Sequence, residues 1–276
     1  MTAPALARGK TGRRYIWPPN TDKPELVVPS VTTILGQLAK PALTNWAAKE
    51  VATYAVENIL AWQDLPTDDA LDLLKRAPYR NMTKKGDLGT AIHTAIDTWI
   101  GGEPTIDNLD LLPYVGAAIS FMDDHVEKVV HSEVTIFNRT YKYAGSTDCI
   151  VTLKDGRTAI VDWKSGKAVY PEVALQLSGY ANGEFIGHDD GTVADLPQID
   201  VGIVVHLPGD GTYTSREIEL TARLWRTFQA LRSIQLWKDD FEADALGKPF
   251  KGSVKTADPA TSKPKGKRNV AKTDNE

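Results

Sequence analysis

The sequence predicts an α/β protein with a mixed central sheet flanked by helices, preceded by a mostly helical N-terminal part. Three apolar runs of strand length, at residues 149–153, 159–161 and 199–207, lie among segments whose apolar residues recur at helical spacing. The run at 199–207 is apolar almost throughout, which is typical of a strand buried on both faces. The order helix, three strands, helix, strand, strand therefore favours a single sheet covered by helices.

The part before the sheet is predicted to be mostly helical, and residues 1–12 are expected to be disordered. Pro41 separates a short helix capped by Ser30 from a longer helix whose apolar spacing predicts one packed face. In order, the predicted elements are strands at 13–17 and 25–28 and helices at 31–38, 43–62 and 66–78.

The central part continues with a helix that starts near Asn81 or Thr83 and ends at a Gly-Gly pair. The remaining predicted elements are a helix at 109–129, a strand at 131–138, the two hairpin strands, a helix at 171–185, strands at 199–207 and 212–218, and a helix at 220–241. We expect an N-terminal part over 13–80, a core over 81–248 and a basic disordered tail over 249–276.

Composition indicates an ordinary soluble protein, with 42% apolar and 25% charged residues in a chain of 276. No apolar run is long enough to span a bilayer, and the N-terminal residues lack the apolar core of a signal peptide. We therefore expect a cytoplasmic protein with no membrane partner. The single cysteine, Cys149, excludes an internal disulfide framework and a four-cysteine iron–sulfur cluster, and its place in a strand predicts a small buried apolar residue.

Charge is unevenly distributed along the chain. The net charge is −4, but residues 251–276 carry seven Lys/Arg and three Asp/Glu, so the rest of the chain has a charge of −8. A polyanionic partner would therefore have to meet a local basic patch, the tail or bound metal ions. The tail either adds salt-dependent affinity for DNA or serves only as a solubilising end.

Acidic residues stand beside both strands of the predicted hairpin. Asp148 opens the first strand and Asp162 closes the second, so antiparallel pairing brings both carboxylates to one end of the sheet. Lys164 follows Asp162 by two positions and shares its face, whereas Trp163 points the other way. Carboxylate oxygens are the ligands that Mg²⁺ or Mn²⁺ prefers, so this end of the sheet is a candidate metal site.

Two further patterns lie upstream and downstream of the hairpin. His93 follows Gly89 by four positions in a predicted helix, and Gln176 and Tyr180 lie four apart, on one face of the helix after the hairpin. Together the four motifs resemble the RecB-type branch of the PD-(D/E)xK nuclease superfamily. In this chain they read Gly89…His93, Gly145-Ser-Thr-Asp148, Asp162-Trp-Lys164 and Gln176-Leu-Ser-Gly-Tyr180.

The resemblance covers roughly residues 86–185, and residues 29–35 and 40–52 are similar to phage-encoded exonucleases of the same branch. It implies a restriction-endonuclease-like core and hydrolysis of DNA phosphodiester bonds. The related CRISPR-associated adaptation nucleases add four cysteines for an iron–sulfur cluster, which this chain lacks. The implied protein is a Mg²⁺- or Mn²⁺-dependent exonuclease of recombination, repair or phage DNA metabolism, in the host cytoplasm if it is phage-encoded.

The resemblance also assigns roles to individual residues. His93 and the backbone carbonyl of Trp163 would complete the metal ligands supplied by Asp148 and Asp162, and imidazole suits Mn²⁺ better than Mg²⁺. Lys164 would orient the attacking water and stabilise the charge of the transition state, because nearby carboxylates disfavour a neutral lysine base. At the DNA strand itself, the implied contacts come from Gln176 and Tyr180.

Four more residues are candidates, each with a structural interpretation beside the functional one. Glu133 borders the metal site or is a surface glutamate, and Asp97 orients His93 or is merely solvated. Lys84 and Lys85 contact phosphate or form a solvated pair. Lys164 itself could be only an ion-pair partner of the acids.

Other functional hypotheses stay open at the level of sequence. The same fold could serve as a catalytically inactive module that binds DNA ends, and the acids could belong to a scaffold protein. Expected partners of the nuclease are DNA, a recombination or single-strand-binding protein, and further copies of the chain in a homo-oligomer.

Overall fold

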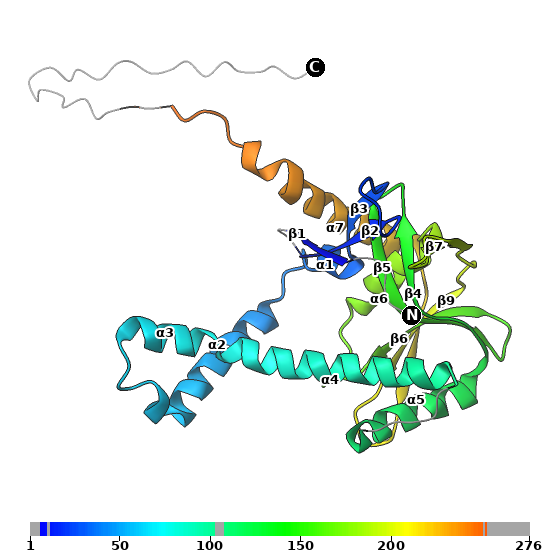
Figure 1. The fold of residues 1–276 in the computed structure, drawn as a ribbon, viewed down its shortest axis with the longest axis horizontal. Helices are drawn as coiled ribbons and strands as arrows, with labels where there is room; N and C mark the ends of the chain where they lie inside the picture. Colours follow the sequence, from blue (N-terminus) through cyan, green and yellow to red (C-terminus); the bar gives the residue numbers. More distant parts are fainter. Residues whose placement is uncertain (1–5, 10–11, 103–107, 251, 253–276) are drawn as a thin grey trace, which may run out of the picture.

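The computed structural model describes residues 6–9, 12–102, 108–250 and 252, with side chains described for 12–80, 86–102, 108–250 and 252 (Figure 1). The helices and strands, in chain order, are β1 (Leu6–Gly9), β2 (Gly12–Trp17), β3 (Leu26–Pro29), α1 (Val31–Leu35), α2 (Pro41–Glu57), α3 (Thr67–Lys75), α4 (Ala77–Ile100), α5 (Leu112–His125), β4 (Val126–Asn138), β5 (Tyr143–Leu153), β6 (Thr158–Lys164), α6 (Val173–Ala181), β7 (Phe185–Gly187), β8 (Val193–Asp195), β9 (Val201–His206), β10 (Thr214–Ile218) and α7 (Ala222–Asp240). Short 3₁₀ helices lie at Ile59–Ala61, Leu109–Leu111 and Glu242–Asp244.

The central sheet has seven strands in the order β10-β9-β6-β5-β4-β7-β8. All neighbouring pairs are antiparallel except β6 and β9, which are parallel. The predicted α/β class with a mixed sheet is therefore confirmed. The hairpin of β5 and β6 is also formed, with Cys149 opposite Val161 at the end where both acids lie.

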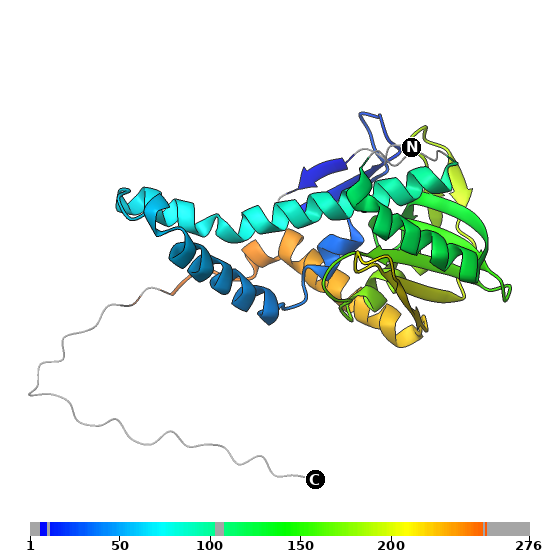
Figure 2. The same ribbon diagram turned by 90° about the horizontal axis from the view of Figure 1, so that it is seen from below.

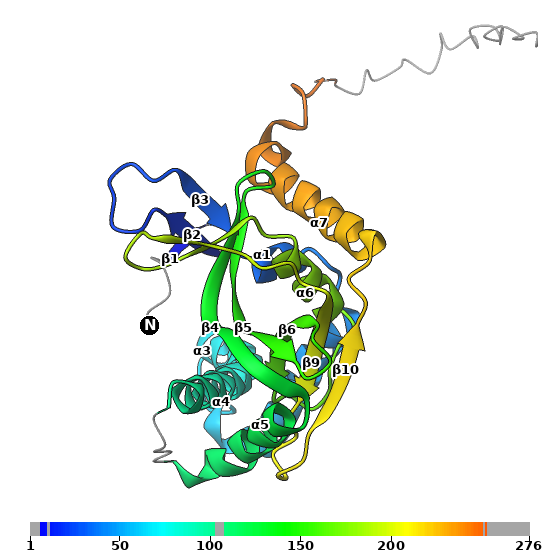
Figure 3. The same ribbon diagram turned by 90° about the vertical axis from the view of Figure 1, so that its right-hand side faces the viewer.

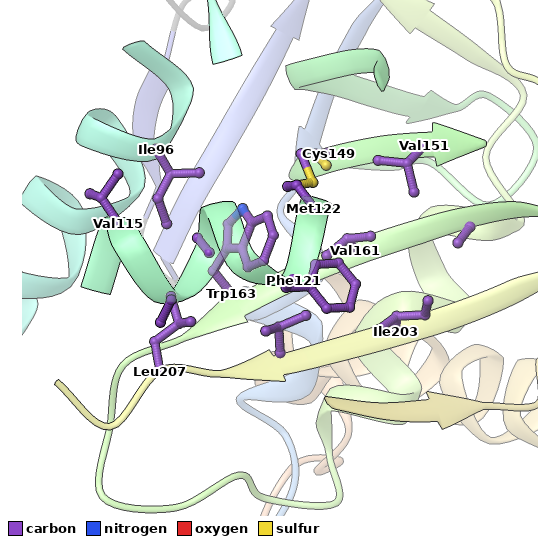
Figure 4. Close-up of a cluster of buried hydrophobic side chains, with 14 of the residues drawn as sticks. Ile96, Val115, Phe121, Met122, Cys149, Val151, Val161, Trp163, Ile203 and Leu207 are labelled. Carbon is purple, nitrogen blue, oxygen red and sulfur yellow. The ribbon is translucent and has the colours of Figure 1, made fainter. Parts of the chain in front are cut away.

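Helices cover both faces of this sheet (Figure 3). On one face, α4 and α5 pack against alternate residues of β5, β6 and β9, and Trp163, Phe121 and the buried Cys149 lie within this core (Figure 4). On the other face, α1, α6 and α7 pack against the intervening residues, such as Ile150 and Ile160. Burial on both faces explains why these strands read as continuous apolar runs.

A small antiparallel sheet of β1, β2 and β3 packs against one end of the central sheet. Tyr15 and Trp17 of β2 contact Phe137 of β4, and Trp17 also contacts Phe185 of β7. Ser30 accepts a hydrogen bond from the Thr33 backbone and so caps α1, as predicted.

The helices α2 and α3 and the first half of α4 extend away from the sheet as an arm (Figures 1 and 2). No residue of α2 or α3 is buried, although the apolar spacing of residues 43–62 predicts a packed face. Two apolar side chains, Val56 of α2 and Leu60 just after it, are more than three-quarters exposed. Within the part of the chain that the structure describes, no helix is both long and apolar enough to cross a membrane.

Several predicted boundaries are wrong. Residues 126–129 belong to β4, not to the preceding helix, and Phe185 begins β7, not the end of α6. Residues 6–9 form a strand where disorder was expected, and β7 and β8 were not predicted. The predicted tail lies almost wholly outside the described residues.

Close packing explains why a glycine occupies position 145, the first residue of the Gly-x-x-Asp motif. A Cβ at Gly145 would lie 2.5 Å from Cε1 of Tyr180 and 3.2 Å from Cγ2 of Val31. Because these neighbours are buried, we expect Gly145→Ala to lower the free energy of unfolding by about 1–3 kcal/mol. Urea denaturation would measure this. The matched control is Gly116→Ala in α5, where a Cβ meets nothing within 4 Å and alanine should stabilise the helix; equal effects of the two variants would contradict the packing account.

Candidate metal centre

Three side chains from three elements converge where the β5–β6 hairpin opens. His93 comes from α4, Glu133 from β4 and Asp148 from β5, and their ligand atoms all lie within 4.8 Å of one another. Each side chain is partly buried. One imidazole nitrogen and two carboxylates in this space form a donor set that suits a divalent cation.

His93 and Asp148 form a close pair, with Nδ1 of the histidine 3.1 Å from Oδ1 of the aspartate. Burial acts to lower the pKa of His93, but the charge and hydrogen bond of Asp148, together with the charges of Asp162 and Glu133, outweigh it and raise the pKa to about 9. Burial acts to raise the pKa of Asp148, yet His93, then Lys164, hold that pKa below its usual range. The surrounding carboxylates therefore favour the imidazolium form of His93.

Glu133 occupies an unusual backbone conformation. Its φ is +48°, a region that residues other than glycine rarely adopt. It lies between the pairs Ser132–Cys149 and Val134–Thr147, and is therefore opposite Asp148 on the neighbouring strand. Burial first, and then the Asp148 charge, raise the pKa of Glu133 to about 7. Two carboxylates facing each other repel, so a cation between them would relieve the repulsion.

The Asp148 side chain also bonds to the backbone of the neighbouring strand, beyond the last paired residues of the hairpin, Cys149 and Val161. The Trp163 backbone N–H donates to Oδ2 of Asp148 at 2.7 Å. The Lys164 carbonyl accepts from Leu207 on the side of β9, so the Trp163 carbonyl, one residue earlier, points towards β5 and Asp148. This is the direction that its predicted role as a metal ligand requires.

Asp162 lies outside the cluster of His93, Glu133 and Asp148, although it was predicted as a metal ligand. Its Oδ1 accepts a hydrogen bond from Gln176 at 2.8 Å. Its Oδ2 is buried and lies 2.5 Å from Nζ of Lys164, so the ammonium is the charged partner of this oxygen. Burial, and then the Asp148 charge, outweigh Lys164 and raise the pKa of Asp162 to about 6.

The predicted DNA-contacting pair lies behind Asp162. Gln176 donates to Asp162 and also contacts the Tyr180 hydroxyl, at 3.2 Å. Tyr180 is only 4% exposed and packs on Gly145, so its ring is not on a surface where a base could stack. This burial disfavours stacking of a base on the ring, whereas the DNA contacts of Gln176 and of the Tyr180 hydroxyl stay predictions. In the structure, Gln176 holds the Asp162 carboxylate.

The remaining candidates have different outcomes. The side chains of Lys84 and Lys85, in α4, lie outside the described residues. Asp97 accepts a hydrogen bond from Ser132 at 2.5 Å, whereas its predicted partner was the His93 ring. The Lys164 side chain is 34% exposed and its ammonium lies beside the Asp162 carboxylate.

Sequence reasoning ranked Glu133 below Asp162 as a metal ligand, and the geometry reverses that order. An alternating strand pattern gave no sign that Glu133 adopts a positive φ and faces Asp148. Its one signal in the sequence was an acidic residue just before the apolar end of a strand, next to the hairpin that carries Asp148.

Comparison with known proteins identifies no relative. No protein-family model matches the chain, and no curated protein matches it significantly.

Proposed function

We propose that the protein is a metal-dependent deoxyribonuclease of the RecB-type PD-(D/E)xK kind, with a restriction-endonuclease-like core. One observation carries the proposal: residues of all four motifs make contacts at one end of the sheet, through His93–Asp148, Gln176–Asp162 and, within the third motif, Asp162–Lys164. The fourth contact joins the glycine of one motif to the tyrosine of another. Four short patterns scattered over ninety residues would not meet in this way by composition alone.

The donor set fits Mg²⁺ or Mn²⁺. His93, Glu133 and Asp148 would hold the ion, and Asp162 would join them if its carboxylate left Lys164. When bound, the ion would neutralise phosphate charge and activate a water for attack on phosphorus. The mixed nitrogen and oxygen ligands favour Mn²⁺ over Mg²⁺.

Lys164 contributes a positive charge at the same place. Its Nζ is held beside Asp162 on a partly exposed side chain, and an ammonium there would donate to a phosphate oxygen or to the attacking water. A preorganised cation of this kind stabilises the negative charge that develops in the transition state. Gln176 donates a hydrogen bond to Asp162 and so helps to hold the Asp162 and Lys164 side chains beside the centre.

The physiological substrate we propose is DNA, degraded from its ends in recombination, repair or phage DNA metabolism. This narrower proposal is supported by the resemblance of the four motifs and of residues 29–35 and 40–52. A circular DNA control separates digestion from ends from internal cleavage.

We expect Lys164→Ala to reduce Mn²⁺-dependent hydrolysis of linear DNA about 10²–10³-fold, because it removes a transition-state charge but no metal ligand. End-labelled single- and double-stranded DNA would report the rate. Lys167→Ala is the matched control, since it removes an exposed lysine three residues away and should cut at the wild-type rate. Undiminished cleavage by the Lys164 variant would refute the assignment. EDTA-insensitive DNA binding by a wild-type protein that never cleaves would instead support the inactive end-binding module.

A further inference from the structure

A hydrogen bond ties two elements of the centre together. Ser132 of β4 donates its hydroxyl to Oδ1 of Asp97 in α4 at 2.5 Å. Asp97 lies one helical turn after His93, on the same face of α4. Ser132 is the residue immediately before Glu133. The bond therefore joins the helix that carries the imidazole to the strand that carries the carboxylate.

Glu133, the residue that follows Ser132, is in a strained backbone conformation. A φ of +48° at a glutamate is a strained conformation, which persists only where the surroundings impose it. The strand pairs on either side, Ser132–Cys149 and Val134–Thr147, fix the backbone beyond Glu133. On the helix side, the Ser132–Asp97 bond fixes the residue from which the Glu133 backbone turns.

The consequence of losing that bond follows from the arrangement of ligands. His93 and Glu133 come from different elements, so their separation depends on how firmly α4 is held against β4. A centre whose ligands are not held in place binds its ion more weakly, and loss of an outer hydrogen bond typically costs 10–100-fold in affinity.

We propose that Asp97 and Ser132 are positioning residues for the metal centre, which act by holding Glu133 in place rather than by contacting the ion or the substrate. The proposal rests on the proposed metal-dependent function. Neither residue belongs to the four motifs of the resemblance, and neither is needed for the chemistry itself.

The test is the affinity for Mn²⁺ alone, measured by calorimetry at constant pH. We expect Ser132→Ala and Asp97→Ala each to bind Mn²⁺ about 10–100-fold more weakly than wild type. The double variant should lose no more than the worse single variant, because both substitutions break one bond. Ser120→Ala is the matched control, since it removes a serine hydroxyl bond within α5, away from the centre, and should bind like wild type.

Two conservative variants separate positioning from charge. Asp97→Asn keeps an oxygen acceptor for Ser132 but removes a negative charge, and we expect its affinity to stay within about threefold of wild type. Ser132→Thr keeps the hydroxyl and should also bind well. An Asn variant as weak as Asp97→Ala would overturn the proposal in favour of a charge effect.

Thermal melts without metal complete the test. If Ser132→Ala lowers the melting temperature but leaves the Mn²⁺ affinity unchanged, the bond is only structural and the proposal is wrong. If wild type itself binds no Mn²⁺, the proposed function fails together with this inference. Wild-type binding with unaffected variants overturns this inference alone.

Discussion

Asp162→Asn is expected to make the metal-free protein more stable while abolishing DNA hydrolysis. Burial, and then the Asp148 charge, raise the pKa of Asp162 to about 6 in the folded protein, from an ordinary value of 3.8. A carboxyl whose folded pKa is raised favours folding only at low pH, and this contribution is lost as the pH rises through 6. At neutral pH the ionised group opposes folding, and a shift of about two units corresponds to roughly 3 kcal/mol at most.

Asparagine keeps an oxygen that can accept the Gln176 hydrogen bond but carries no charge. We expect thermal melts in EDTA at pH 7.5 to show an increase of several degrees, and the difference from wild type to vanish near pH 4. Asp87→Asn, at an exposed position of α4, is the control and should melt like wild type. A variant less stable than wild type at pH 7.5 would show that the Lys164 ion pair outweighs the burial of the carboxylate.

Mn²⁺ affinity is expected to rise steeply with pH, by at least about a hundredfold between pH 6 and pH 8.5. Metal ligands bind in their deprotonated forms, so ions compete with protons at each raised pKa. The pKa of Glu133 is about 7, and that of His93, which Asp148 raises against the effect of burial, is about 9. Binding therefore releases up to two protons below pH 7 and about one between pH 7 and pH 9.

Calorimetry in buffers of different ionisation enthalpy counts these protons directly. Glu133→Gln has no carboxyl proton to release at this position. Its Mn²⁺ affinity should therefore rise less steeply below pH 7, while the rise that comes from deprotonation of His93 remains. An affinity that did not change with pH would mean that the ion binds elsewhere.

The sequence contained enough to predict the sheet end where the centre lies. Strand length, a turn and the alternation of faces were sufficient to bring Asp148, Asp162 and Lys164 together, because a hairpin is a local structure whose register follows from its turn. The pairing of apolar runs into a two-sided sheet was predictable for the same reason: burial on both faces leaves a strong pattern.

The ligand set needed information that is not local. Which acid faces His93 depends on the conformation of one residue, Glu133, and on how α4 crosses β4. The burial of Tyr180 depends on Gly145, thirty-five residues earlier, and helical spacing could not reveal it. The passage from His125 to Val126 turns a helix into a strand with no glycine or proline to mark it.

The hydrogen bond from the Trp163 amide means that the Asp148 carboxylate links β5 to β6, in addition to being a candidate metal ligand. Asp148→Ala would leave the Trp163 amide without this hydrogen bond. A protein inactivated by that substitution would therefore also have a loosened β5–β6 hairpin. A variant meant to bind DNA without cutting it is therefore better made at Lys164, because removing that ammonium leaves the hydrogen bond between Trp163 and Asp148 intact.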